Sequence, residues 1–111
     1  MQINQEVVQG VLVISPEGRL DATTAPVFSE QILGLFGQYP HAVIDFSSVA
    51  YVSSAGLRAI LMAAKHRRQT GGKMALCAMA EPIREVFEIS GFCSLIDVLP
   101  DMPAALAKVK A

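Results

Sequence analysis

Apolar runs and segments with helical periodicity alternate along the chain from residue 11 onward. Residues 11–14, 43–46 and 74–77 are short apolar runs, the first two followed by polar turns. Between and after these runs, apolar residues recur at the three- and four-residue spacing of amphipathic helices. This alternation predicts an α/β domain with a partly parallel sheet.

The ends of several elements are marked by turn and capping residues. Two apolar runs on either side of Gln9-Gly10 predict a β-hairpin. A first helix should be capped by Thr23 or Thr24, carry Pro26 in its first turn and end at Gly37. The later elements expected are a helix over about 54–70, a strand over 74–77, a helix over 82–91, a strand over 95–98 and a helix after residue 101. The inward-facing helical residues expected are Phe28, Ile32, Leu35, Phe36, Leu57, Ile60, Leu61, Ala64, Ile83, Val86, Phe87, Met102, Ala105, Leu106 and Val109.

The segment 43–61, VIDFSSVAYVSSAGLRAIL, predicts a buried strand, a polar turn and the start of a helix. Ser53 is the more natural N-cap of that helix, which leaves Ser54 facing solvent. The small residues Ala55 and Gly56 leave the helix end uncovered. Free N–H groups and the helix dipole favour an anion at such an end, so a serine here can carry a phosphate without disturbing the fold.

The amino-acid composition limits the kinds of function that we expect for this protein. The 111 residues suit one domain, and their 52% hydrophobic content can form a core. Nine basic and ten acidic residues give no basic face of the kind that binds nucleic acid. No apolar run reaches the ~20 residues of a membrane span, and the N-terminus shows no secretory signal, so a cytoplasmic protein is expected.

Cysteine and histidine usage argues against cofactor chemistry. Cys77 and Cys93 are far apart in apolar settings, which predicts two reduced core thiols. His41 and His66 lack partners at metal-ligand spacing, so neither a metal site nor another cofactor is expected. No nucleophile elbow, dinucleotide-binding or phosphate-binding glycine motif is found. The sequence therefore predicts a protein that is not an enzyme.

Four separated blocks resemble the STAS domain of bacterial anti-sigma factor antagonists. The first block is DFSSVAYVSSAGLR, residues 45–58. The others are GRLD (18–21) with TAP (24–26), GG (71–72) with MALC (74–77), and VF (86–87) with SG (90–91). The resemblance implies a single STAS domain over residues 1–111. It also implies a mixed sheet of four or five strands, with about four helices packed mainly on one side.

The same resemblance points to a phosphorylation site. In the family, the serine that follows Asp in the motif D-S-[ST]-G-L is phosphorylated, and this position corresponds to Ser54. Ser53 stands in place of the family's Asp, and Ala55 stands in place of the following Ser or Thr. A purely structural capping role is the alternative for Ser54.

The family's function is partner switching. The resemblance implies that the unphosphorylated protein binds an anti-sigma factor that is a serine kinase, which frees a sigma factor. Phosphorylation of Ser54 then ends binding, and a PP2C-type serine phosphatase resets the cycle. Two alternatives remain open: a constitutive accessory subunit of an ABC-type lipid or solute transporter, and a switch that acts on a non-sigma target.

Particular residues are expected at the partner surface. These residues are Asp21, Ser53, Ser54, Gly56 and Arg58. For Asp21 the alternative is a solvated loop carboxylate or an extra cap for the first helix.

Two further groups have other expected roles. Asp45 and Ser53 are expected to support the loop that carries the acceptor, with Asp45 hydrogen-bonded to nearby backbone N–H groups. The basic run 65–68 is expected on a solvated helix face, with a phosphate or lipid-headgroup site as the alternative.

Overall fold

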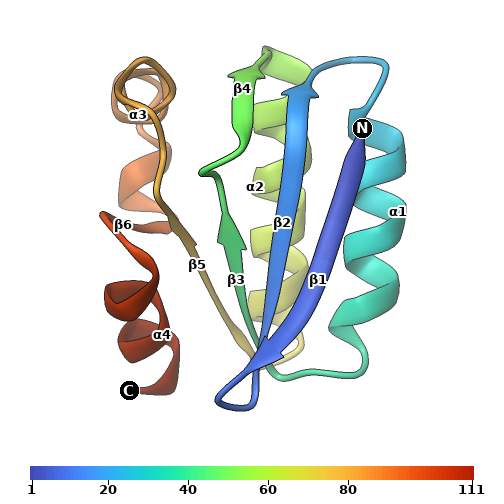
Figure 1. Cartoon of the computed structure of the whole chain (residues 1–111), viewed down its shortest axis with the longest axis vertical. Helices are drawn as coiled ribbons and strands as arrows, with labels where there is room; N and C mark the ends of the chain where they lie inside the picture. The colour runs from blue at the N-terminus through green and yellow to red at the C-terminus, as the bar shows by residue number, and fades with distance from the viewer.

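The computed structural model describes residues 1–111, apart from the side chain of Cys93. Alternating strands and helices form one α/β domain (Figure 1). The elements are β1 (Gln2–Val8), β2 (Val11–Leu20), α1 (Ala25–Phe36), β3 (His41–Asp45), β4 (Val49–Val52), α2 (Ser54–Gln69), β5 (Lys73–Cys77), α3 (Glu81–Ile89), the 3₁₀ turn η1 (Phe92–Ser94), β6 (Asp97–Leu99) and α4 (Met102–Lys110).

The sheet has six strands, where the resemblance implied four or five. Its order is β1-β2-β3-β5-β6, and only β1 is antiparallel to its neighbour. The difference arises because β2 is ten residues long and can pair with two successive strands. Its first half pairs with β3, and its end pairs with β4, so β3 and β4 follow one another along the same edge of β2.

Two apolar clusters cover the two faces of the sheet. The larger cluster contains buried residues of α1, α2 and α3, including Phe28, Ile60 and Phe87. The smaller cluster packs α4 against β2, β3 and β5 through residues such as Leu106 and Val109. The prediction that helices lie mainly on one side is therefore confirmed, with α4 on the other side.

The structure corrects two predictions about which helical residues face inward. Val86 is 39% exposed, because α3 buries only a narrow face through Ile83 and Phe87. Arg67 is only 4% exposed, although it was expected on a solvated helix face. Its guanidinium carbon lies 4.7 Å from the centre of the Phe36 ring, where a planar cation can stack on an aromatic face.

Buried Arg67 joins two segments at one end of the domain. Its Nη1 donates to the carbonyl of Tyr39, and its Nη2 donates to Thr70 Oγ1 at 2.7 Å. Burial lowers the pKa of the guanidinium. These contacts fix the C-terminal end of α2 against the connection between α1 and β3.

The last strand begins later than predicted. Leu95 was expected in it, but Leu95 is 47% exposed and follows the η1 turn, and β6 begins at Asp97. Gly91 adopts a positive φ of 80° just before η1, which turns the chain out of α3. A three-residue strand is too short to show an alternating pattern in the sequence.

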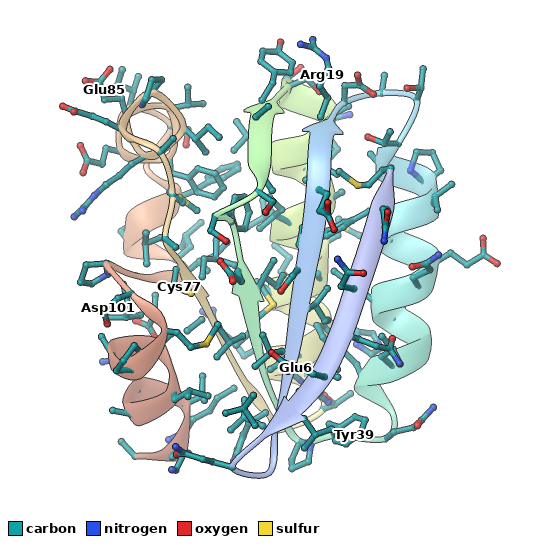
Figure 2. The ribbon with its side chains drawn as sticks, in the orientation of Figure 1. Glu6, Arg19, Tyr39, Cys77, Glu85 and Asp101 are labelled. Carbon is teal, nitrogen blue, oxygen red and sulfur yellow. The ribbon has the colours of Figure 1, made fainter. Side chains whose placement is uncertain are left out.

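Cys77 is a buried free thiol at the end of β5, as predicted, whereas the side chain of Cys93 lies outside the described residues. Burial raises the pKa of the Cys77 thiol to about 11, and the nearby carboxylates of Asp45 and Asp101 add to the shift. Cys77 and Asp101 lie between β5 and the start of α4 in Figure 2. Within the described residues, no helix is long and apolar enough to cross a membrane.

Candidate functional site

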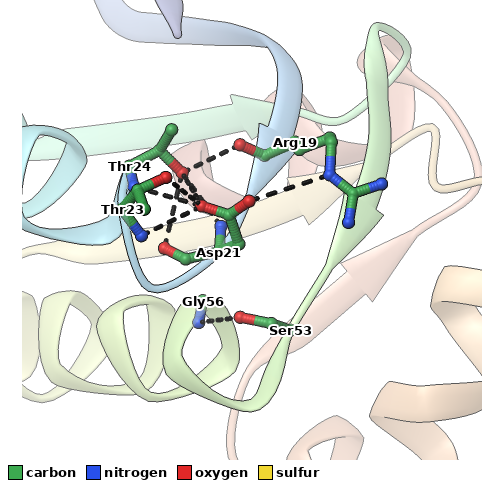
Figure 3. A network of polar contacts seen from close by, with 6 residues as sticks. All are labelled: Arg19, Asp21, Thr23, Thr24, Ser53 and Gly56. Atoms are coloured by element: carbon green, nitrogen blue, oxygen red, sulfur yellow. Dashed lines mark hydrogen bonds and ion pairs between the residues drawn. The ribbon is translucent and has the colours of Figure 1, made fainter.

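The candidate site lies where β2 and β4 end and α2 begins. Leu20 pairs with Val52 in the parallel ladder between the two strands, and the Ser53 N–H donates to the Leu20 carbonyl at 2.9 Å. The loop 21–24 therefore lies directly beside the first turn of α2 (Figure 3). Three separate segments meet at this point because the strands are parallel and end at the same edge of the sheet.

Ser53 is the N-cap of α2, as predicted. It has extended backbone angles, and its Oγ accepts a hydrogen bond from the Gly56 N–H at 3.2 Å. Ser54 is the first helical residue and is exposed. The described residues provide no hydrogen-bond partner for its hydroxyl, so capping by Ser53 leaves the Ser54 hydroxyl free for chemistry.

Gly56 allows α2 to approach β2 closely. A Cβ at this position would lie 2.4 Å from the Leu20 carbonyl oxygen, which is closer than real Cβ contacts come. Gly56 is also buried. The structure therefore gives Gly56 a packing role beneath the site, and contact of this residue with a partner stays a prediction.

Asp21 organises the loop between β2 and α1. One carboxylate oxygen, Oδ1, accepts hydrogen bonds from the Thr23 hydroxyl at 2.7 Å, the Thr23 N–H at 3.0 Å and the Thr24 N–H at 3.2 Å. The bond from the Thr23 hydroxyl is the main cause of a lowered Asp21 pKa. These bonds end at Thr23 and Thr24, before α1 begins at Ala25, so the carboxylate organises the loop rather than capping the helix. Contact of Asp21 with a partner stays a prediction.

Arg19 and Tyr51 form a pair beside this loop that sequence reasoning missed. Arg19 pairs with Tyr51 across the β2–β4 ladder, and its guanidinium carbon lies 4.2 Å from the centre of the Tyr51 ring. Arg19 Nε also lies 3.7 Å from Asp21 Oδ2. The Arg19 side chain is 63% exposed, so the pair presents a cation and an aromatic ring to solvent. Only the strand register brings these residues together.

The remaining predicted residues are Arg58 and Asp45. Arg58 is exposed on α2, four residues after Ser54, and side chains at this spacing share a helix face. Asp45 accepts a hydrogen bond from the Ser47 N–H at 2.9 Å, as expected. That bond holds the turn between β3 and β4. Support by Asp45 of the loop that precedes α2 stays a prediction.

The start of α2 can accommodate added negative charge. An exposed hydroxyl stands at the N-terminus of a 16-residue helix, where the dipole and free N–H groups stabilise added negative charge. Among the described residues no cluster of His, Cys, Asp and Glu could hold a metal ion.

Comparison with known proteins identifies the family. The STAS domain family matches residues 2–105 of the chain. This chain belongs to the STAS domain family. BtrV of Bordetella bronchiseptica, named as a candidate anti-sigma factor antagonist, is 33% identical over 99% of this chain and 96% of its own length.

Solved structures share the STAS fold of this chain. An anti-sigma factor antagonist from Mycobacterium paratuberculosis superposes with a TM-score of 0.90 at 25% identity, covering 99% of this chain and 94% of its own. SpoIIAA of Bacillus in its phosphorylated form superposes with a TM-score of 0.73 at 20% identity, covering 97% of this chain and 99% of its own. The agreement extends over nearly the whole domain.

Proposed function

We propose that this STAS domain is a partner-switching regulator of the anti-sigma factor antagonist type, controlled by phosphorylation of Ser54. The observation that carries the proposal is the exposed, unpartnered Ser54 hydroxyl beside a separate cap, Ser53, at the start of α2. The name of the relative BtrV and the phosphorylated form of SpoIIAA support the same function.

In the unphosphorylated state, the surface around Ser54 binds an anti-sigma factor that is a serine kinase. The exposed Arg19–Tyr51 pair lies on this surface and offers it an anchor, because arginine and tyrosine are enriched among the residues that dominate binding energy. Arg58 adds a second cation on the same side of α2. Capture of the kinase frees the sigma factor that it had held, in the cytoplasm.

Phosphorylation changes charge at this surface without a change of fold. A phosphoserine adds roughly −1.5 to −2 charge, and the α2 N-terminus stabilises that charge within this protein. A bound partner would have to desolvate the phosphate, which is costly. The Asp21 carboxylate on the adjoining loop adds like charge that the partner must also accommodate. The phosphoprotein is therefore released, and a PP2C-type phosphatase restores the acceptor.

Phosphate mapping tests the assignment. The chain is incubated with ATP and an anti-sigma factor kinase from the same organism, and fragment mass spectrometry locates the phosphate. One phosphate is expected on Ser54, none on Ser54→Ala, and nearly normal uptake by Ser53→Ala, which loses a cap worth about 1 kcal/mol. Labelling of Ser54→Ala but not of Ser53→Ala would move the acceptor to Ser53.

Binding measurements test the switch itself. Ser54→Ala should bind the kinase as wild type does, because only a hydroxyl is lost. Ser54→Asp should bind at least tenfold more weakly, although it carries less charge than a phosphate. If no serine is labelled and Ser54→Asp binds like wild type, the switch is refuted, and a constitutive subunit role of the transporter type takes its place.

A further inference from the structure

A second polar site lies at the end of the domain opposite Ser54. A cavity of about 170 Å³ opens between the C-terminal part of α2, the start of β5, the segment 95–97 and α4. It exists because β6 pairs with β5 only from Ala75 onward, which leaves Lys73 and Met74 at an open sheet edge. Figure 2 labels a residue at each end of the domain. Arg19 lies at the end that carries Ser54, and Tyr39 lies at the opposite end, where its carbonyl accepts a hydrogen bond from Arg67.

The walls of this cavity concentrate positive charge. Four of the nine Lys and Arg residues of the chain line it, and Asp97 is the single acidic residue among the lining residues. The four basic residues are Arg67, Arg68, Lys73 and Lys108. The ion pairs found among the described side chains, Arg19–Asp21 and Arg84–Glu88, involve none of them.

Buried Arg67 places a positive charge at the wall of this cavity. Arg67 is 4% exposed, and its Nε has no hydrogen-bond partner among the described residues, although both terminal nitrogens are bonded. The Nε atom lies against Gly72, where an added Cβ would stand 2.5 Å from it, and Gly72 also lines the cavity. Because Nε is sealed from water, Arg67 can attract an anion in the cavity through its charge rather than through a direct hydrogen bond from Nε.

The helix ends neutralise only part of this charge. Arg67 and Arg68 lie in the last turn of α2, and Lys108 lies in the last turn of α4. Each helix C-terminus contributes about half a negative charge, and Asp97 contributes one more. Three cations therefore leave the site positive by about one charge, even when Lys73, which donates to the carbonyl oxygen of Ala111, is not counted.

We propose that this cavity binds a phosphate group, either as a free ion or as the terminal group of a small phosphorylated metabolite. Its volume suits one phosphate and a few waters, with any organic part left in solvent. Arg68 Nη2 already donates to the Leu95 carbonyl at 3.0 Å, which holds the side chain at the cavity wall. Lys108 closes the opposite wall from α4 and has no ion-pair partner among the described side chains. This site is separate from Ser54 and does not depend on the switching function.

Titration with defined anions tests the site. Inorganic phosphate, pyrophosphate and glycerol 3-phosphate are added to the full chain while amide chemical shifts are followed by NMR. We expect saturable shifts at Gly72, Lys73 and Asp97, little change at Ser54, and Kd values at or below about 1 mM. Tighter binding of glycerol 3-phosphate than of inorganic phosphate would assign a metabolite, and the reverse order would assign the free ion.

Matched variants separate a built site from general charge attraction. Lys108→Ala and Arg68→Ala should each raise Kd about tenfold, because each removes a charged donor. Lys65→Ala removes an exposed cation from the same helix as Arg68, outside the cavity, and should leave Kd unchanged. Absence of saturation by roughly 10 mM of every anion would overturn the proposal. Equal weakening by Lys65→Ala, or binding only to anionic lipid vesicles, would also overturn it.

Discussion

The carbonyl oxygen of Leu20 lies against the α-carbon of Gly56, so that a side chain at position 56 would begin 2.4 Å from it. This contact joins the end of β2 to the first turn of α2. The Ser53 N–H donates to the same carbonyl. Two backbone groups and the missing Cβ of Gly56 therefore set the height of α2 above the sheet.

Gly56→Ala should destabilise the domain, because the new methyl group must push α2 away from β2. The expected loss is about 1–3 kcal/mol of unfolding free energy, the usual cost of overpacking. Urea unfolding measures it. Gly34→Ala is the matched control, since Gly34 lies within α1 and an added Cβ there meets nothing within 4 Å. That variant should gain up to about 1 kcal/mol from helix propensity. Equal effects of the two variants would contradict the close contact at Gly56.

Asp21→Ala should destabilise the protein more at pH 7 than at pH 3. The carboxylate pKa is lowered in the folded state, chiefly by the Thr23 hydroxyl, from an ordinary value of 3.8. A lowered pKa gives stability that is present above the ordinary value and is lost as the pH falls through the folded-state value. Urea midpoints of wild type and variant should therefore converge as the pH falls from about 5 to 3. A constant difference across this range would show that the hydrogen bonds to Asp21 do not depend on its charge.

Wild-type stability should decline as the pH rises from about 9 toward 11, and Cys77→Ala should remove part of that decline. The Cys77 thiol has a pKa of about 11 in the fold, against an ordinary value of 9.0, because it is buried near Asp45 and Asp101. The unfolded chain loses this proton first, so alkaline pH favours unfolding. The test is the slope of unfolding free energy against pH, not its absolute value, because the variant also creates a small cavity. Parallel slopes for the two proteins would count against the raised pKa.

The local elements of the site follow from the sequence alone. Ser53 caps a helix through a bond to a residue three positions later, and Ser54 follows as the first helical residue, so neighbours along the chain decide both roles. The alternation of apolar runs and amphipathic segments likewise determines the α/β class. Asp45 was predicted to bond backbone N–H groups for the same reason, since its partner is only two residues away.

Tertiary structure decides what depends on contacts between distant segments. Arg19 meets Tyr51 only through the β2–β4 register, and the basic cavity forms only because β6 starts late beside α2 and α4. The sequence predicts Arg67 on a charged helix face. In the structure it is buried, because it stacks on the Phe36 ring and donates a hydrogen bond to the Tyr39 carbonyl. Side-chain pattern reports which face of an element is apolar, whereas strand register and helix placement determine which polar groups share a site. These are set by packing between distant segments, which no local pattern encodes.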